Sequence, residues 1–147
     1  MTNNFTGAGD TADAVVVQPD GRIVAAGATQ RKFTLVRYDS NGTLDSSFGA
    51  GGRMTTDFGL SDSAFSLTLQ SNGKIVAGGS TFIKDAYQPA LARYNANGIL
   101  DDTFGTGGKL LPTFGGSCVL IQPDGKLVTA GGAQGSGNTD FALARYN

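Results

Sequence analysis

Oxygen-bearing side chains recur at one spacing in two segments of the chain, and this pattern suggests a site for a hard cation. The segments are Asp39-x-Asn41-Gly42-x-x-Asp45 and Asn95-x-Asn97-Gly98-x-x-Asp101. Carboxylate and amide oxygens are the ligands that Ca²⁺ prefers. The spacing is not that of an EF-hand loop, and no Glu closes either segment. We favour an Asn-Gly turn held by its own side-chain hydrogen bonds, with calcium as the alternative.

Side chains that commonly carry catalysis are scarce. The 147 residues include no His and one Cys, so there is no imidazole base or Ser–His pair, and a structural zinc site lacks ligands. Asp101 and Asp102 are adjacent carboxylates, but neighbouring residues on a strand point in different directions. We therefore expect no enzymatic activity and no cofactor. Cys118 precedes Val119 and Leu120, and we expect its thiol to be buried.

Arginine and aspartate recur together in the same part of the chain. Arg37 and Arg93 each precede a Tyr, and Asp45 and Asp101 follow eight residues after them. We predict a structural Arg–Asp pair in each case, which fixes the connection that follows the strand. The alternative is a repeated sugar or carboxylate site, as in a lectin.

The elements that carry these residues belong to a repeat. Gln18-Pro19-Asp20-Gly21 returns as Gln70-Ser71-Asn72-Gly73 and as Gln122-Pro123-Asp124-Gly125, at a spacing of 52 residues. An apolar segment follows each of these turns. A fixed period of this length indicates a stacked or radial repeat architecture. The chain also contains 23 Gly, and all 12 of its acidic residues are Asp, which favours short strands and tight turns over helices.

One repeat predicts four antiparallel strands. They cover residues 14–17, 22–28, 33–38 and 53–58, with a Pro-Asp-Gly turn between the first two. Such a unit is the blade of an all-β propeller. We expect the first strand of each blade to be apolar on both faces. The chain is predicted to be a single domain, 1–147, with repeats at 13–59, 64–115 and 117–147, the last one lacking its fourth strand.

Three motifs in fixed order resemble the delta-60 repeat, a bacterial β-propeller repeat. They are Gln122 to Val128, the Ala-Leu-Ala-Arg-Tyr-Asn sequence at 90–95 and 142–147, and the Leu-Asp-x-x-Phe-Gly-x-Gly-Gly sequence at 44–52 and 100–108. The resemblance covers nearly the whole chain. It implies a propeller, often within large surface or secreted bacterial proteins, and it implies no catalytic residues and no settled ligand.

The first residues of the chain match the fourth strand of a blade. Met1 to Phe5 aligns with Met54 to Phe58, so we expect residues 1–7 to complete the last blade of a second copy. Propellers typically have about 4–8 blades, and six is the multiple of three in this range. We therefore predict a homodimer that forms one six-bladed ring. The alternative is a fragment, or an engineered half, of a larger propeller.

The segments between the second and third strands differ most among the repeats. They span residues 29–32, 80–88 and 132–139, and variable loops are where a ligand site is commonly placed. We expect exposed apolar side chains at Phe82, Ile83 and Tyr87, with packing inside a long loop as the alternative. A small molecule or a glycan is the expected ligand class. The candidate binding residues are Gln30, Arg31, Lys32, Phe82, Ile83, Tyr87, Gln134 and Asn138.

Charge and hydropathy argue against nucleic acids and membranes as partners. The formal net charge is −1 with no basic cluster, so we expect no nucleic-acid partner. No apolar run approaches the roughly 20 residues that span a membrane. The residues from Met1 to Asp10 lack the basic and apolar regions of a signal peptide, so a secreted location is suggested by the resemblance alone.

Overall fold

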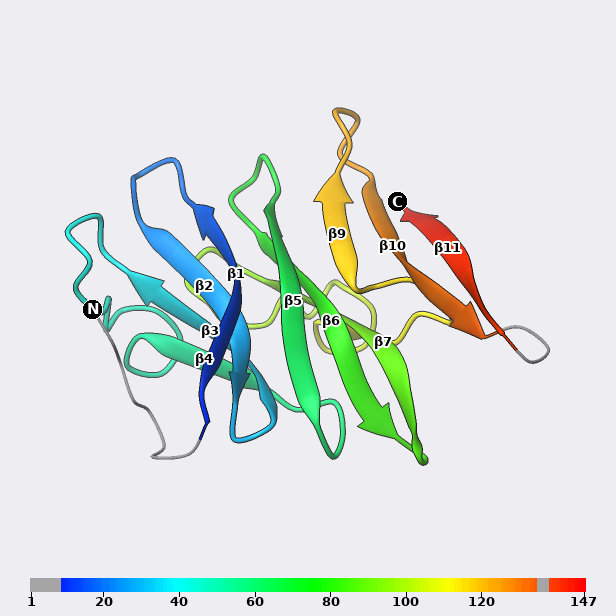
Figure 1. Ribbon diagram of the computed structural model, residues 1–147. Helices are drawn as coiled ribbons and strands as arrows, with labels where there is room; N and C mark the ends of the chain where they lie inside the picture. Colours follow the sequence, from blue (N-terminus) through cyan, green and yellow to red (C-terminus); the bar gives the residue numbers. More distant parts are fainter. Residues whose placement is uncertain (1–8, 135–137) are drawn as a thin grey trace.

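The computed structural model describes residues 9–134 and 138–147 and consists of three antiparallel sheets that stand side by side (Figure 1). Strands follow sequence order within each sheet. The first sheet contains β1 (Thr11–Val17), β2 (Ile23–Thr29), β3 (Lys32–Tyr38) and β4 (Arg53–Thr56). The second contains β5 (Asp62–Leu69), β6 (Ile75–Ile83), β7 (Ala86–Tyr94) and β8 (Lys109–Leu110). The third contains β9 (Cys118–Ile121), β10 (Leu127–Gln134) and β11 (Thr139–Tyr146).

This arrangement confirms the all-β prediction for the described residues, which contain no helix. It follows that they include no helix able to cross a membrane. The first strands of the sheets, β1, β5 and β9, are neighbours along one side of the molecule (Figure 1). The turns after these strands project at one end, here called the turn end. The β2–β3 and β6–β7 hairpins project at the other, here called the hairpin end.

The repeated turn explains why each sheet starts with a hairpin. Gly21 has φ of 84° and donates its N–H to the Gln18 carbonyl at 2.9 Å, while Gln18 N donates to Arg22 O at 2.7 Å. Gly73 and Gly125 repeat this geometry, with φ of 81° and 82°. Glycine suits these positions because it adopts positive φ without a Cβ clash.

A β-bulge interrupts the first hairpin in two of the sheets. The register of β1 with β2 shifts between Ala12 and Ala14, and that of β5 with β6 shifts between Ala64 and Ser66. Gly79 lies opposite Ala64, where a Cβ would overlap the Ser63 carbonyl. The bulges therefore depend on a glycine in the facing strand.

Apolar side chains fill the two contacts between sheets. The first seam lies between the first and second sheets and buries Val24, Phe33, Leu35, Ile75 and Tyr94. The second seam lies between the second and third sheets and buries Val76, Leu91, Val119 and Leu127. Each sheet thus contributes opposite faces to successive seams, as a row of blades does.

Two expectations about burial are wrong. The first strands are not all apolar on both faces, because β5 carries Ser63, Ser66 and Thr68, and Ser66 hydrogen-bonds across the second seam to Val119. Cys118 is exposed, because it lies at the start of β9 on the side away from Val119. The predicted closing strand, residues 1–7, lies outside the described residues.

Candidate functional site

The first Arg–Asp pair is a buried bracket between two sheets. Arg37 Nε donates to Asp45 Oδ2 at 2.7 Å, and the two side chains are only 5% and 8% exposed. Arg37 also donates from Nη1 to the carbonyl of Ala96 in the β7–β8 connection at 2.6 Å, and its guanidinium stacks 4.7 Å from the Phe48 ring centroid. The structure therefore brings Arg37 and Asp45 together and makes them part of the first seam.

The second pair is less buried and includes a lysine. Arg93 Nε donates to Asp101 Oδ2 at 2.6 Å, and Lys74 Nζ donates to the same oxygen at 2.7 Å. The Arg93 and Lys74 side chains are 18% and 27% exposed. Arg93 also stacks 4.8 Å from the Phe104 ring centroid. The repeated ion pair thus has the same geometry in two sheets but differs in its access to water.

Both aspartates are held in their charged form. Hydrogen bonds from Ser47, the side chain first and then the backbone, and from Arg37 lower the pKa of Asp45, although burial opposes this shift. The hydrogen bond from Lys74, followed by those from Thr103 and Arg93, holds the pKa of Asp101 well below its usual range. Neither carboxyl is thereby suited to accept or release a proton near neutral pH.

The calcium candidates lie in turns that use their oxygens internally. Asn41 Oδ1 accepts hydrogen bonds from Thr43 N at 2.9 Å and from Thr43 Oγ1 at 2.7 Å. In the second segment, Asn97 Oδ1 accepts from Ile99 N at 3.1 Å. Asp39 accepts from Arg22, Asp45 and Asp101 accept as described above, and Asn95 uses its amide nitrogen to donate to Leu100 O. Among the described residues, no three His, Cys, Asp or Glu side chains form a group that could hold a metal ion.

The first candidate loop is a two-residue turn. Thr29 pairs with Lys32, so Gln30 and Arg31 are the turn residues, and both adopt positive φ, 49° and 59°. Their side chains are exposed. Lys32 points instead toward the β4–β5 connection, where Nζ contacts Gly59 O at 3.2 Å and Asp57 at 2.8 Å. Gln30 and Arg31 therefore form the turn, Lys32 ties it to the β4–β5 connection, and none of the three lines either of the hollows described below.

The second candidate loop is an extension of the β6–β7 hairpin, because the pairing of the two strands continues to Ile83 and Ala86. The expected long loop is therefore wrong. Phe82 and Ile83 are half-buried, whereas Tyr87 is 71% exposed. The Phe82 and Tyr87 rings make an edge contact with centroids 5.0 Å apart, so Phe82 supports the exposed tyrosine. Gln134 ends β10 opposite Thr139, and Asn138 is exposed just before β11.

A pocket opens at the hairpin end of the second seam. Its volume is about 600 Å³, and it lies between the β6–β7 hairpin and the β8–β9 connection. Tyr87 lines it together with Phe114, which is 39% exposed. Its other described lining residues are uncharged: Ser80, Ala86, Gln88, Pro89, Pro112, Thr113, Gly115, Ser117, Gly132, Ala133 and Thr139. We call it the hairpin pocket.

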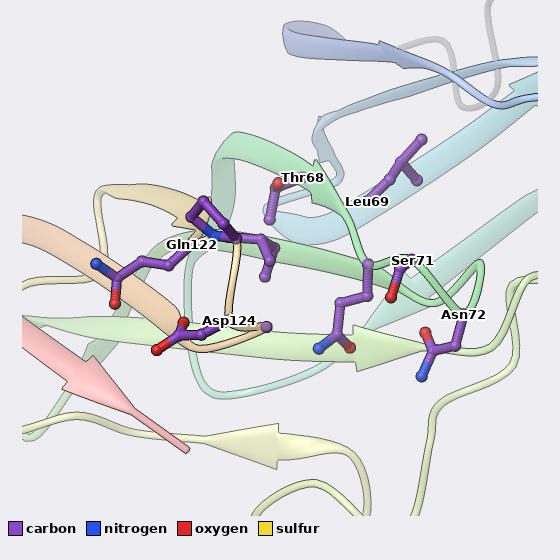
Figure 2. Close-up of a pocket in the computed structure, with 10 residues that line it drawn as sticks. Thr68, Leu69, Ser71, Asn72, Gln122 and Asp124 are labelled. Carbon is purple, nitrogen blue, oxygen red and sulfur yellow. The ribbon is translucent and has the colours of Figure 1, made fainter.

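A second hollow lies between the turns at the opposite end of the same seam. Figure 2 shows Thr68, Leu69, Ser71 and Asn72 on one side of this hollow, with Gln122 and Asp124 on the other. Its volume is about 800 Å³. Within the described part of the chain, the side-chain carbonyls of Gln70 and Gln122 are buried there without a hydrogen-bond partner.

Sequence reasoning placed Tyr87 in the variable region but missed the rest of the hairpin pocket. Phe114 occupies the repeat position of Asp62, 52 residues later, and Ala133 that of Thr81. This replacement of a polar pair by an apolar pair is the feature of the sequence that could have indicated the pocket. It is visible only once the repeats are aligned beyond their common motifs.

Comparison with known proteins gives one family. The family model described as "Domain of unknown function (DUF5122) beta-propeller" matches residues 18–48, 70–104 and 122–147. These segments make up more than half of the chain, and each covers the first turn of a repeat and the strands that follow. No curated protein matches the sequence.

Proposed function

The chain belongs to the DUF5122 β-propeller family, and on this premise we propose that it is a non-catalytic binding scaffold that closes into a six-bladed ring with a second copy of itself. The observation that carries the proposal comes from comparing equivalent positions in the three repeats. Positions that are buried at the two seams within the chain are exposed on the outward faces of the first and third sheets.

The outward face of the third sheet matches a buried face of the first. Phe33 and Leu35 are fully buried in the first seam. Their repeat counterparts in β11 are Phe141 and Leu143, which are 86% and 59% exposed. Two large apolar side chains that stand next to each other on a sheet favour an apolar partner surface.

The outward face of the first sheet shows the complementary pattern. Leu67 and Leu69 in β5 pack against the core of the first seam. Val15 and Val17 hold the same places in β1, because Val17 pairs with Ile23 as Leu69 pairs with Ile75. These valines are 64% and 63% exposed. The two outward faces therefore expose the two halves of an apolar contact that is formed between sheets in the first seam.

A second copy supplies both missing surfaces at once. Its first sheet covers Phe141 and Leu143, while its third sheet covers Val15 and Val17, and a head-to-tail contact of this kind ends when the ring closes. Three sheets per chain give six blades, within the usual range of about 4–8. Residues 1–7 are proposed to pair with β11 of the other copy and thereby cover a sheet edge.

Light scattering coupled to size exclusion tests the assembly. We expect a mass of twice the 15.0 kDa of one chain. Leu143→Asp and Val17→Asp place a charge in the proposed contacts and are each expected to yield monomer or aggregate. Leu60→Asp is the matched control, because Leu60 is 73% exposed on the β4–β5 connection, outside both faces.

A folded monomer of the unmodified chain would refute the ring. So would a dimer that persists in both Leu143→Asp and Val17→Asp. Closure by further blades of a longer polypeptide is the competing arrangement. It predicts a monomeric 147-residue chain that becomes monodisperse and more stable only when additional repeats are joined to it.

A further inference from the structure

The hairpin pocket exists because one polar clamp is not repeated. In the second sheet, Asp62 accepts hydrogen bonds from Thr81 Oγ1 at 2.5 Å and from Phe58 N at 2.9 Å. Both side chains of the clamp are fully buried. The clamp ties the connection that enters β5 to the end of β6.

The third sheet has Phe114 and Ala133 at the two clamp positions. Neither side chain can form the clamp hydrogen bond. Phe114 instead lines the pocket and remains 39% exposed. Leaving a phenylalanine in contact with water has no structural benefit, since apolar area is stabilising only when it is buried.

At the hairpin end of the first seam, hydrogen bonds close the position that the pocket occupies in the second seam. There, Asp62 N donates to the Arg31 carbonyl at 2.8 Å, and Lys32 Nζ reaches Gly59 O at 3.2 Å. In the second seam, Gln88 takes the repeat position of Lys32 and lines the pocket. A charged side chain that ties the hairpin to the β4–β5 connection in the first seam is thus replaced by a neutral amide beside a cavity in the second.

The lining specifies the chemistry of a ligand. The part of the lining that the structure describes contains no charged side chain, so an anionic or cationic ligand would lose hydration without a partner there. Tyr87 and Phe114 supply two aromatic surfaces, and Ser80, Gln88 and Ser117 supply hydroxyl and amide groups. A sugar ring presents apolar C–H faces to aromatic rings and hydroxyl groups to such polar side chains.

We propose that the hairpin pocket binds a neutral saccharide, with Tyr87 and Phe114 as the surfaces for its ring. The proposal deepens the proposed binding scaffold and rests on it for the idea that the propeller carries a ligand. It does not require the ring, because the described lining comes from the second and third sheets of one chain.

Isothermal titration calorimetry with defined probes tests this assignment. The neutral probes are maltohexaose, cellohexaose and fully N-acetylated chitohexaose; the comparison probes are trigalacturonic acid, which is anionic, and adenosine, which is planar and aromatic. We expect at least one neutral probe to bind, and to bind more tightly than both comparison probes. No binding by any neutral probe, or tighter binding of adenosine, would overturn the proposal.

Two variants locate the binding. Tyr87→Ala removes an exposed aromatic surface and is expected to weaken binding by about 10-fold or more, the effect of losing a central aromatic contact. Phe114→Asp with Ala133→Thr builds into the third sheet the same Asp–Thr clamp that the second sheet has. This double variant is expected to abolish binding. Leu60→Ala is the control and should bind as the unmodified chain does. Unchanged affinity in Tyr87→Ala and in the double variant would also overturn the proposal.

The two proposals fail separately. Circular dichroism and light scattering on the same samples report folding and mass for every variant. A ring that binds no neutral saccharide contradicts the pocket assignment alone, whereas a monomer that binds one contradicts the ring alone. If the double variant does not fold, Tyr87→Ala still decides the matter, because its side chain is largely outside the core.

Discussion

The first and second seams join the same kinds of sheet in different ways. At the first seam, Arg37 crosses to the Ala96 carbonyl, Gly49 N donates to Asn97 O, and Arg31 O accepts from Asp62 N. These contacts secure both ends of the seam around a buried apolar centre. The second seam has an apolar centre and the Ser66–Val119 hydrogen bonds, but a cavity lies at each of its ends.

The difference shows which residues serve the architecture and which are available for binding. The apolar centre of each seam comes from positions that recur in every sheet. The contacts that close the ends come from positions that change, such as Lys32 and Gln88. A propeller can therefore lose an end contact, gain a cavity and keep its strand order. Variants that act on only one seam make this comparison testable.

The largest expected effect comes from filling the space behind the bulge at the first seam. An alanine at Gly79 would place Cβ against the Ser63 carbonyl and 2.9 Å from Phe33 Cε2. Because a backbone group cannot easily move aside, we expect Gly79→Ala to lower the free energy of unfolding by about 3–5 kcal/mol. Urea denaturation followed by circular dichroism measures this loss.

Gly131→Ala is the matched variant in the third sheet. A Cβ there would lie 3.0 Å from Gly115 Cα and 3.4 Å from Ser117 Oγ. Those atoms belong to the β8–β9 connection beside the hairpin pocket, so we expect a loss of only about 1 kcal/mol. Equal losses at the two glycines would mean that the bulge opposite Gly79 leaves as much room for a Cβ as the β8–β9 connection leaves opposite Gly131.

Much of the strand pattern was predictable from the sequence, and for a local reason. The Pro-Asp-Gly and Asn-Gly turns mark hairpins, and alternation in segments such as 33–38 marks strands, so β2 and β3 were placed within a residue or two of their ends. The bulge at Phe65 was not predicted, because it depends on how close β6 comes to the bulged backbone rather than on a turn motif.

The site was less predictable, because it depends on contacts between repeats. Tyr87 was identified through loop variability, although its position on an extended hairpin was not. Phe114 escaped notice because an isolated phenylalanine in a connection is commonly a packing residue. Its importance comes from the neighbours it lacks, namely an aspartate at its own position and a threonine at Ala133.

The two Arg–Asp brackets provide the next prediction. In Asp45→Asn, Arg37 keeps its charge in a buried place without its carboxylate, and we expect a loss of about 2–4 kcal/mol. Asp101→Asn should cost less, about 1–2 kcal/mol, since Arg93 and Lys74 retain some access to water. Urea midpoints at pH 7 give both values. A larger loss for Asp101→Asn would contradict the view that burial sets the difference.

These losses should depend on pH in a defined direction. Both carboxyls have a lower pKa in the folded chain than the ~3.9 of an unfolded aspartate. Their contribution is therefore fully present above about pH 5 and is lost as the pH falls below the unfolded value toward the folded one. The stability gap between each Asn variant and the unmodified chain should narrow from pH 5 to pH 2.5, and a gap that widens would contradict this linkage.

The smallest expected effect concerns the two hairpin turns, which the seams use differently. Gln30, Arg31, Lys84 and Asp85 all have positive φ, a conformation that favours Asn and Gly in two-residue turns. Replacing each pair with Asn-Gly should raise stability by about 0.5–1 kcal/mol, because strain at the turn outweighs the extra flexibility of glycine in the unfolded chain. The Arg31 carbonyl that accepts from Asp62 N is retained in Arg31→Gly, so the first seam stays closed.

The Lys84→Asn/Asp85→Gly variant should bind saccharide as before, since neither residue lines the hairpin pocket. Thermal unfolding and calorimetry check both expectations, and a loss of binding in this last variant would show that the turn itself, rather than Tyr87 and the pocket walls, contacts the ligand.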